Sequence, residues 1–219
     1  MITYEQIRNN ADIKSYIQAA DASLEALGYT EHSFAHVSRV AETAAYILSS
    51  LGYSEREILN ARIAGYLHDI GNLVNRVDHS QSGAVMAFRI LDKLGMSSLD
   101  IAEIVTAIGN HDEGTGVAVN AVAAALILAD KSDVRRSRVR NHDITSFDIH
   151  DRVNYSVEKS ELDFTEDKQG LVLSLTVDVT IGTVMDYFEI FLGRMVMCRK
   201  AAEKLGLRFS LVINGQKLL

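Results

Sequence analysis

Residues 66–71 read Tyr-Leu-His-Asp-Ile-Gly, in which His68 and Asp69 stand side by side. A neutral imidazole and a carboxylate are good ligands for a divalent transition metal. The pair alone is weak evidence, because His precedes Asp at three more places, 111–112, 142–143 and 150–151. The surroundings of each pair must therefore decide which of them forms a site.

Helical spacing of apolar residues predicts that several His and Asp side chains point inward. His36 lies on or beside the apolar face of a helix over 34–51, and His68 extends the apolar face of the next helix. His111 and Asp130 continue two further apolar faces. A buried carboxylate is costly unless something compensates its charge. A nearby His or Arg would satisfy one such group, but inward His and Asp residues on separate helices favour a shared metal ion.

The same spacing predicts the remaining elements. Period-two alternation of apolar residues indicates strands near 153–157 and over 171–179, joined by a polar turn at 166–170, with a last strand at 209–213 and a turn at 214–215. Expected helices cover 5–27, 34–51, a segment after the capping box of Ser54 and Glu57, 80–95, 98–109, 121–136 and 183–205, with Thr30 a candidate cap for the second.

We therefore expect a mainly α fold. Residues 1–150 would form a helical metal-binding domain, and residues 151–219 a small α/β appendage of strand-strand-helix-strand order. The absence of Pro fits a helical chain, because helix interiors exclude it. An exposed edge strand in the appendage invites pairing with another chain, so a homodimer is expected.

Composition narrows the classes of function. The 219 residues are 47% hydrophobic and 23% charged, which is typical of a globular protein. The net charge of −7 argues against a general nucleic-acid binder, which needs surplus Lys and Arg. The single Cys198, expected to be a small buried residue, excludes an intrachain disulfide. The N-terminus lacks a signal peptide pattern, and the longest apolar run, 121–129, is too short for a membrane span, so we expect a cytoplasmic protein.

Four segments taken in order resemble the HD-domain superfamily of metal-dependent phosphohydrolases, over about residues 30–136. They are His36-x-x-x-Val40-Ala41, His68-Asp69-Ile70-Gly71, His111-Asp112-Glu113 and Ala129-Asp130-Lys131. His79, in the segment 78–84, is similar to the branch of that family that carries extra histidines and holds two metals.

The resemblance implies a set of ligands. His36, His68, Asp69 and Asp130 would bind the first metal, Asp69 would bridge, and His79 and His111 would complete the second site. Asp112 would position a ligating His or the attacking water. The ions would be divalent transition metals, with iron, manganese, nickel, cobalt and zinc all acceptable to such ligands. His142 and His150 match no part of the motif and are expected not to be ligands. His32 could line the pocket or belong to the exposed first turn of its helix, and we expect the exposed position.

The chain departs from the family at Asn72, where many members carry Lys. Asn can still donate a hydrogen bond to a substrate, but it brings no charge. Five basic residues between 131 and 140, directly after Asp130, could supply the positive charge that Asn72 lacks. Of these, Lys131 and Arg135 are our candidates for binding substrate phosphate, because Arg and Lys pair well with phosphate oxygens. A solvated basic helix end is the alternative interpretation of this segment.

The implied function is hydrolysis of a small phosphate ester or anhydride, with a nucleotide-like substrate expected from the resemblance alone. Neither a Walker-type phosphate loop nor a nucleophile-elbow motif is present. Two alternatives stay open. A few proteins with this ligand arrangement are diiron oxygenases, and a non-catalytic metal-binding module for sensing or assembly would also retain the ligands.

Overall fold

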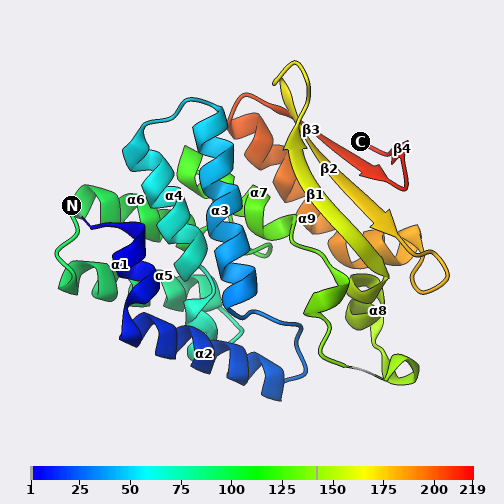
Figure 1. The fold of residues 1–219 in the computed structure, drawn as a ribbon, viewed down its shortest axis with the longest axis horizontal. Coiled ribbons are helices and arrows are strands. Elements are labelled where there is room, and N and C mark those ends of the chain that lie inside the picture. Colours follow the sequence, from blue (N-terminus) through cyan, green and yellow to red (C-terminus); the bar gives the residue numbers. More distant parts are fainter. Residues whose placement is uncertain (1, 142) are drawn as a thin grey trace. The chain divides into compact units, whose positions relative to one another are not determined.

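The computed structural model describes residues 2–141 and 143–219, which form two compact units that divide between Asp130 and Lys131 (Figure 1). The division falls before the boundary expected at residue 150. The mainly helical class with a small C-terminal sheet is confirmed. Within the described residues, no helix combines the length and the apolar character that a membrane crossing requires.

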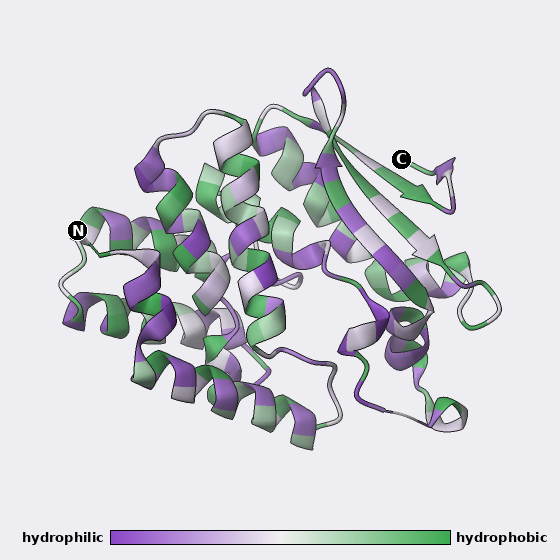
Figure 2. Cartoon of the chain, in the orientation of Figure 1, coloured by the Kyte–Doolittle hydropathy of each residue, from purple (hydrophilic) through white to green (hydrophobic). Residues whose placement is uncertain are grey.

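The first unit is entirely helical, and Figure 2 shows hydrophobic and hydrophilic bands alternating along its helices. This alternation lets each helix bury one face and expose the other. The capping box predicted at Ser54 and Glu57 is confirmed. The elements are α1 (Tyr4–Asn9), α2 (Ala11–Ala26), α3 (Phe34–Ser50), α4 (Glu55–Leu67), the 3-10 turn η1 (Ile70–Leu73), α5 (His79–Lys93), α6 (Ser98–Gly109) and α7 (Ala121–Lys131).

Glycines allow two close helix contacts that hold the His68-Asp69 segment. α3 packs along α4, and a Cβ on Gly65 would lie 2.7 Å from the Cα of Ala41. η1 packs on α5, where a Cβ on Gly71 would overlap the carbonyl oxygen of His79 and the backbone N of Gly83. The Gly of the 66–71 stretch is therefore required by packing, because only hydrogen fits at this crossing.

The second unit is a four-stranded sheet with helices. β1 (Val157–Phe164) and β2 (Gly170–Val177) form an antiparallel hairpin. The crossover helix α9 (Val184–Lys204) leads to β3 (Arg208–Ile213), which pairs parallel to β2, and β4 (Gln216–Lys217) pairs antiparallel to β3. The remaining elements are η2 (Arg136–Arg138), η3 (Ile144–Ser146) and α8 (Ile149–Ser156).

The core of the second unit lies between the sheet and α9, which contacts β2 and β3. Leu171, Leu173, Leu175 and Val177 are buried, as the period-two alternation predicted, but the strand ends there and Val179 is 56% exposed. Cys198 on α9 is fully buried, as expected.

Several expected elements and caps are wrong in detail. The helix predicted over 5–27 is two helices, because the extended backbone of Asn10 ends α1 and its side chain caps α2. Ser33, not Thr30, caps α3. The strand expected near 153–157 is mostly the helix α8, which starts where Asp148 accepts a hydrogen bond from the backbone of Asp151. Short alternation does not by itself separate a strand from an amphipathic helix.

The helix expected to run from 121 to about 136 ends at Lys131. The basic segment that follows is therefore not a helix end. It contains an extended Arg135 and the short 3-10 turn η2, in which Arg138 is buried.

Candidate metal centre

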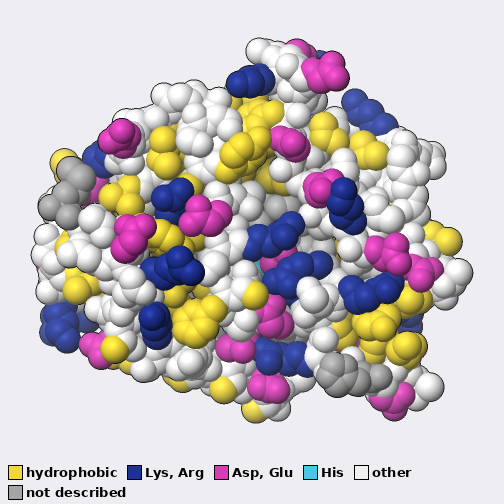
Figure 3. Space-filling view, in the orientation of Figure 1, with side chains coloured by type: hydrophobic (Ala, Val, Ile, Leu, Met, Phe, Trp, Pro, Cys, Tyr) yellow, Lys and Arg dark blue, Asp and Glu magenta, His cyan; other side chains and the backbone are white. Residues whose placement is uncertain are grey.

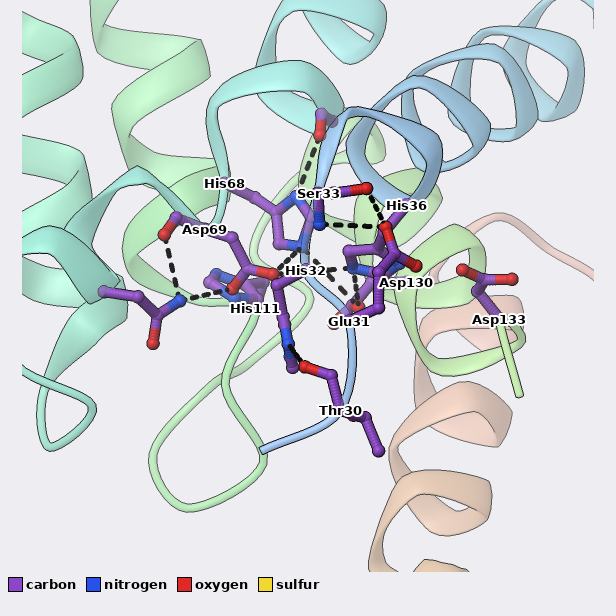
Figure 4. Close-up of polar contacts among 12 residues, drawn as sticks. Thr30, Glu31, His32, Ser33, His36, His68, Asp69, His111, Asp130 and Asp133 are labelled. Carbon is purple, nitrogen blue, oxygen red and sulfur yellow. Dashed lines mark hydrogen bonds and ion pairs between the residues drawn. The ribbon is translucent and has the colours of Figure 1, made fainter. Parts of the chain in front are cut away.

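Side chains from three helices of the first unit converge on one point (Figure 4). His36 comes from the first turn of α3, His68 and Asp69 from the end of α4, and Asp130 from the end of α7. His36 and His68 are fully buried and Asp69 is nearly so. The inward positions expected for His36, His68 and His111 are found, and the side chain of Asp130 is 12% exposed.

The separations within this group suit ligands of one ion. Nε2 of His36 lies 3.4 Å from Oδ1 of Asp130 and 3.5 Å from Oδ2 of Asp69. Nε2 of His68 lies 3.2 Å from Oδ2 of Asp69 and 3.6 Å from Oδ1 of Asp130. Ligands bound at about 2.0–2.2 Å from one ion stand roughly 3 Å apart. These atoms are thus close to the spacing that a shared cation requires.

His79 and His111 extend the cluster. Their Nε2 atoms lie 3.2 Å apart, and Nε2 of His79 lies 3.7 Å from Oδ1 of Asp69. Since the other oxygen of Asp69 faces His36 and His68, the carboxylate stands between the two groups of histidines. Two sets of three residues have ligand atoms within 4.8 Å of one another: His36, His68 and Asp130, and His68, Asp69 and His111.

Backbone carbonyls orient three of the imidazoles. Nδ1 of His68 lies 2.8 Å from the carbonyl oxygen of Gly65, and Nδ1 of His111 lies 2.6 Å from that of Ile108. Nδ1 of His79 lies 3.1 Å from the carbonyl oxygen of Arg76. When Nδ1 donates its hydrogen to a carbonyl, Nε2 keeps its lone pair for a metal.

Whether these residues suit a metal ion can be judged from the hydrogen bonding of the Nε2 atoms. Within the described residues, the buried Nε2 of His68 makes no hydrogen bond of good geometry, although two carboxylates face it. A buried polar atom without a hydrogen bond is costly, and a bound cation removes that cost. The residues present therefore fit a divalent metal.

His68 and Asp69 each shift the pKa of the other. Burial opposes the charge on His68, but Asp69 and Asp130 outweigh it and raise the pKa of His68 to about 10. Burial likewise opposes ionisation of Asp69, yet His68 and His32 together with a hydrogen bond from His36 hold the pKa of Asp69 well below its ordinary value. A proton on His68 thus occupies the place of a cation between two carboxylates.

Asn72 lies beside Asp69. Its Nδ2 donates to Oδ1 and to the backbone carbonyl of Asp69, both at 2.9 Å. Asn72 is buried, and these bonds hold the carboxylate in place. Its proposed contact with substrate stays a prediction.

The other candidate residues lie in different surroundings. The side chain of Asp112 is 32% exposed, with Oδ1 3.9 Å from Nε2 of His79, so it stands at the edge of the cluster. Lys131 and Arg135 belong to the second unit. Lys131 is buried, and Nε of Arg135 donates to Oδ1 of Asp133 at 2.9 Å while Nη1 donates to Ser137.

Of the two positions considered for His32, the favoured exposed one is wrong. The residue is half-buried, and its ring centroid lies 5.6 Å from that of His36. Nδ1 of His32 lies 2.6 Å from the carbonyl oxygen of Thr30, and Figure 4 shows the ring beside the cluster. His32 precedes Ser33, the N-cap of α3, so the apolar pattern of that helix does not place its ring. His150 is exposed in the second unit, and His142 lies outside the described residues.

Known proteins resemble this chain in the region of the cluster. A profile of the HD domain matches residues 33–152. An uncharacterized protein, MJ1020, of Methanocaldococcus jannaschii is 24% identical in an alignment 210 residues long, and the match covers 85% of this chain and 79% of that protein. The crystal structure of a predicted HD superfamily hydrolase from an uncultured Thermotogales bacterium is 27% identical, with a TM-score of 0.45, and the match covers 59% of this chain and 69% of that one.

Proposed function

Since this chain belongs to the HD domain family, we propose that it is a metal-dependent phosphohydrolase that cleaves a phosphate ester or anhydride. The observation that carries the proposal is the cluster of four histidines and two aspartates, whose ligand atoms face one another inside the first unit. A nucleotide or dinucleotide is the proposed substrate class. Its basis is the resemblance to the family.

Each residue of the cluster has a proposed role in the reaction. His36, His68, Asp69 and Asp130 would hold one divalent ion, and His79, His111 and the second oxygen of Asp69 would hold another. When bound, such ions supply an activated water at neutral pH and positive charge for the phosphoryl oxygens. Asn72 fixes the carboxylate of Asp69 by two hydrogen bonds. At the exposed edge of the cluster, Asp112 would orient a water or accept its proton, a role supported by the 3.9 Å between its Oδ1 and Nε2 of His79.

The test begins with the metal content of protein purified without chelator or added metal and away from oxygen. The metal-loaded protein is then assayed for phosphate release on a panel of nucleotides, dinucleotides and simple phosphate esters. We expect activity that a chelator abolishes and that Asp69→Asn lowers by roughly a thousandfold or more. His150→Ala, which changes an exposed histidine of the second unit, is the matched control and should retain full activity.

Two other results would replace the proposal. Bound iron with oxygen consumption and no phosphate release would indicate a diiron oxygenase. Bound metal with neither activity on a wide panel would favour a non-catalytic sensing or assembly module.

A further inference from the structure

Arg76 lies between η1 and α5, at the rim of the metal cluster. Its Nη1 is 3.3 Å from Nε2 and 3.5 Å from Nδ1 of His79, and 3.4 Å from Oδ1 of Asn72. Its own carbonyl oxygen accepts the hydrogen bond that orients His79. The guanidinium therefore sits against a side chain whose Nε2 faces His111 and Asp69.

No carboxylate among the described residues forms an ion pair with Arg76. Its other neighbour is the ring of Tyr29, whose centroid lies 5.7 Å from Cζ of the guanidinium. The side chain is half-buried, so its charge is neither fully hydrated nor neutralised by an acid. This contrasts with Arg135, which Asp133 engages directly.

A permanent positive charge next to a metal ligand is unfavourable when the metal is bound, because the cation and the guanidinium repel each other. An anion bound between the metal ion and the guanidinium offsets this repulsion, and both positive charges stabilise the anion. Arg also presents paired N–H donors that match phosphate oxygens. The arrangement thus favours a phosphoryl group bound between the cluster and Arg76.

We propose that Arg76 binds a phosphoryl group of the substrate, which rests on the proposed phosphohydrolase function. Asn72 is uncharged, and its side-chain amide already donates hydrogen bonds to Asp69. Arg76 contacts the Oδ1 of that same Asn72 and supplies the missing positive charge. Tyr29 positions the guanidinium from the other side.

The experiment measures binding of inorganic phosphate to metal-loaded protein by calorimetry, for wild type, Arg76→Gln, Arg76→Lys and Arg89→Gln. Arg89 is an exposed residue of α5 and gives the same change of net charge away from the cluster. Metal content is determined for every sample. We expect Arg76→Gln to raise the dissociation constant for phosphate by about tenfold or more, Arg76→Lys to be intermediate, and Arg89→Gln to stay within about twofold of wild type.

Three results would overturn the inference. The first is an Arg76→Gln variant that keeps its metal and binds phosphate as tightly as wild type does. The second is an Arg76→Gln variant that loses metal, which would mean that Arg76 only supports His79. Metal-loaded wild type that binds no phosphate would also exclude the role. Activity is measured separately. Arg76-dependent phosphate binding without hydrolysis of any substrate would contradict the proposed function and leave Arg76 as a phosphate-binding residue of a non-catalytic protein.

Discussion

Nε2 of His79 lies 3.2 Å from Nε2 of His111, although 32 positions separate the two residues in the sequence. Each ring directs its Nδ1 to a backbone carbonyl three residues earlier. Two imidazoles oriented in this way leave two Nε2 atoms side by side, and a cation between or beside them satisfies both. This pair is the basis for expecting a second metal ion.

We therefore expect about two metal ions per chain in wild type and about one in His79→Ala and in His111→Ala. Elemental analysis of protein purified anaerobically without added metal gives the count. His150→Ala is the matched control and should keep the wild-type content. A wild-type content of about one ion, unchanged by His79→Ala, would leave a mononuclear site and make His79 a rim residue.

Asn72→Ala should weaken metal binding by roughly 10- to 100-fold, because it removes both hydrogen bonds that orient Asp69. Competition with a chromophoric chelator measures the change. Asn75→Ala is the control: that side chain is exposed and accepts only from the backbone of Val77. Equal affinities for the two variants would show that Asp69 does not depend on Asn72.

Metal binding should release a proton from His68. The pKa of this residue is raised to about 10 in the metal-free protein, so it is protonated at pH 8, where an ordinary histidine is neutral. Because the metal requires the neutral ring, its apparent affinity should rise with pH until the pH passes about 10. The low pKa of Asp69 means that this carboxylate contributes no proton in that range.

Calorimetric metal titrations at pH 8 in two buffers of different ionisation enthalpy measure the released protons. We expect about one proton per chain from the first ion bound. Identical heats in the two buffers would contradict the raised pKa.

Gly71→Ala should destabilise the first unit by about 2–4 kcal/mol, because its Cβ would overlap the carbonyl oxygen of His79 and the backbone N of Gly83. Urea unfolding with a helical signal measures the free energy. Gly193→Ala is the opposite case: the site is an exposed position within α9 with no atom near the added Cβ. That variant should gain about 0.5–1 kcal/mol from helix propensity. A neutral Gly71→Ala would mean that η1 and α5 can move apart.

The expected homodimer stays a prediction. The described sheet ends at β1 on one side and at the two-residue β4 on the other, so backbone groups at its edges can pair with a second chain. On the face seen in Figure 3, charged side chains of both signs lie among hydrophobic and uncharged ones. Light scattering at micromolar concentration decides: a mass near 24.1 kDa would mean a monomer.

Much of the secondary structure followed from local pattern. The capping box at Ser54, the turns near 166–170 and 214–215, and the buried alternation of β2 each depend on residues close in sequence. Errors arose where local signals were ambiguous. Asn10 both ended one helix and capped the next, and the alternation near Val153 fitted an amphipathic helix as well as a strand.

Local pattern was enough to indicate which residue types would meet, because His and Asp on apolar helix faces point inward and need a shared partner there. The three-dimensional fold supplied what no local pattern contains. It set Nε2 of His79 3.2 Å from Nε2 of His111, and Nε2 of His36 3.4 Å from Oδ1 of Asp130. The two residues of each pair come from separate helical segments, and helix periodicity carries no information about how separate helices cross.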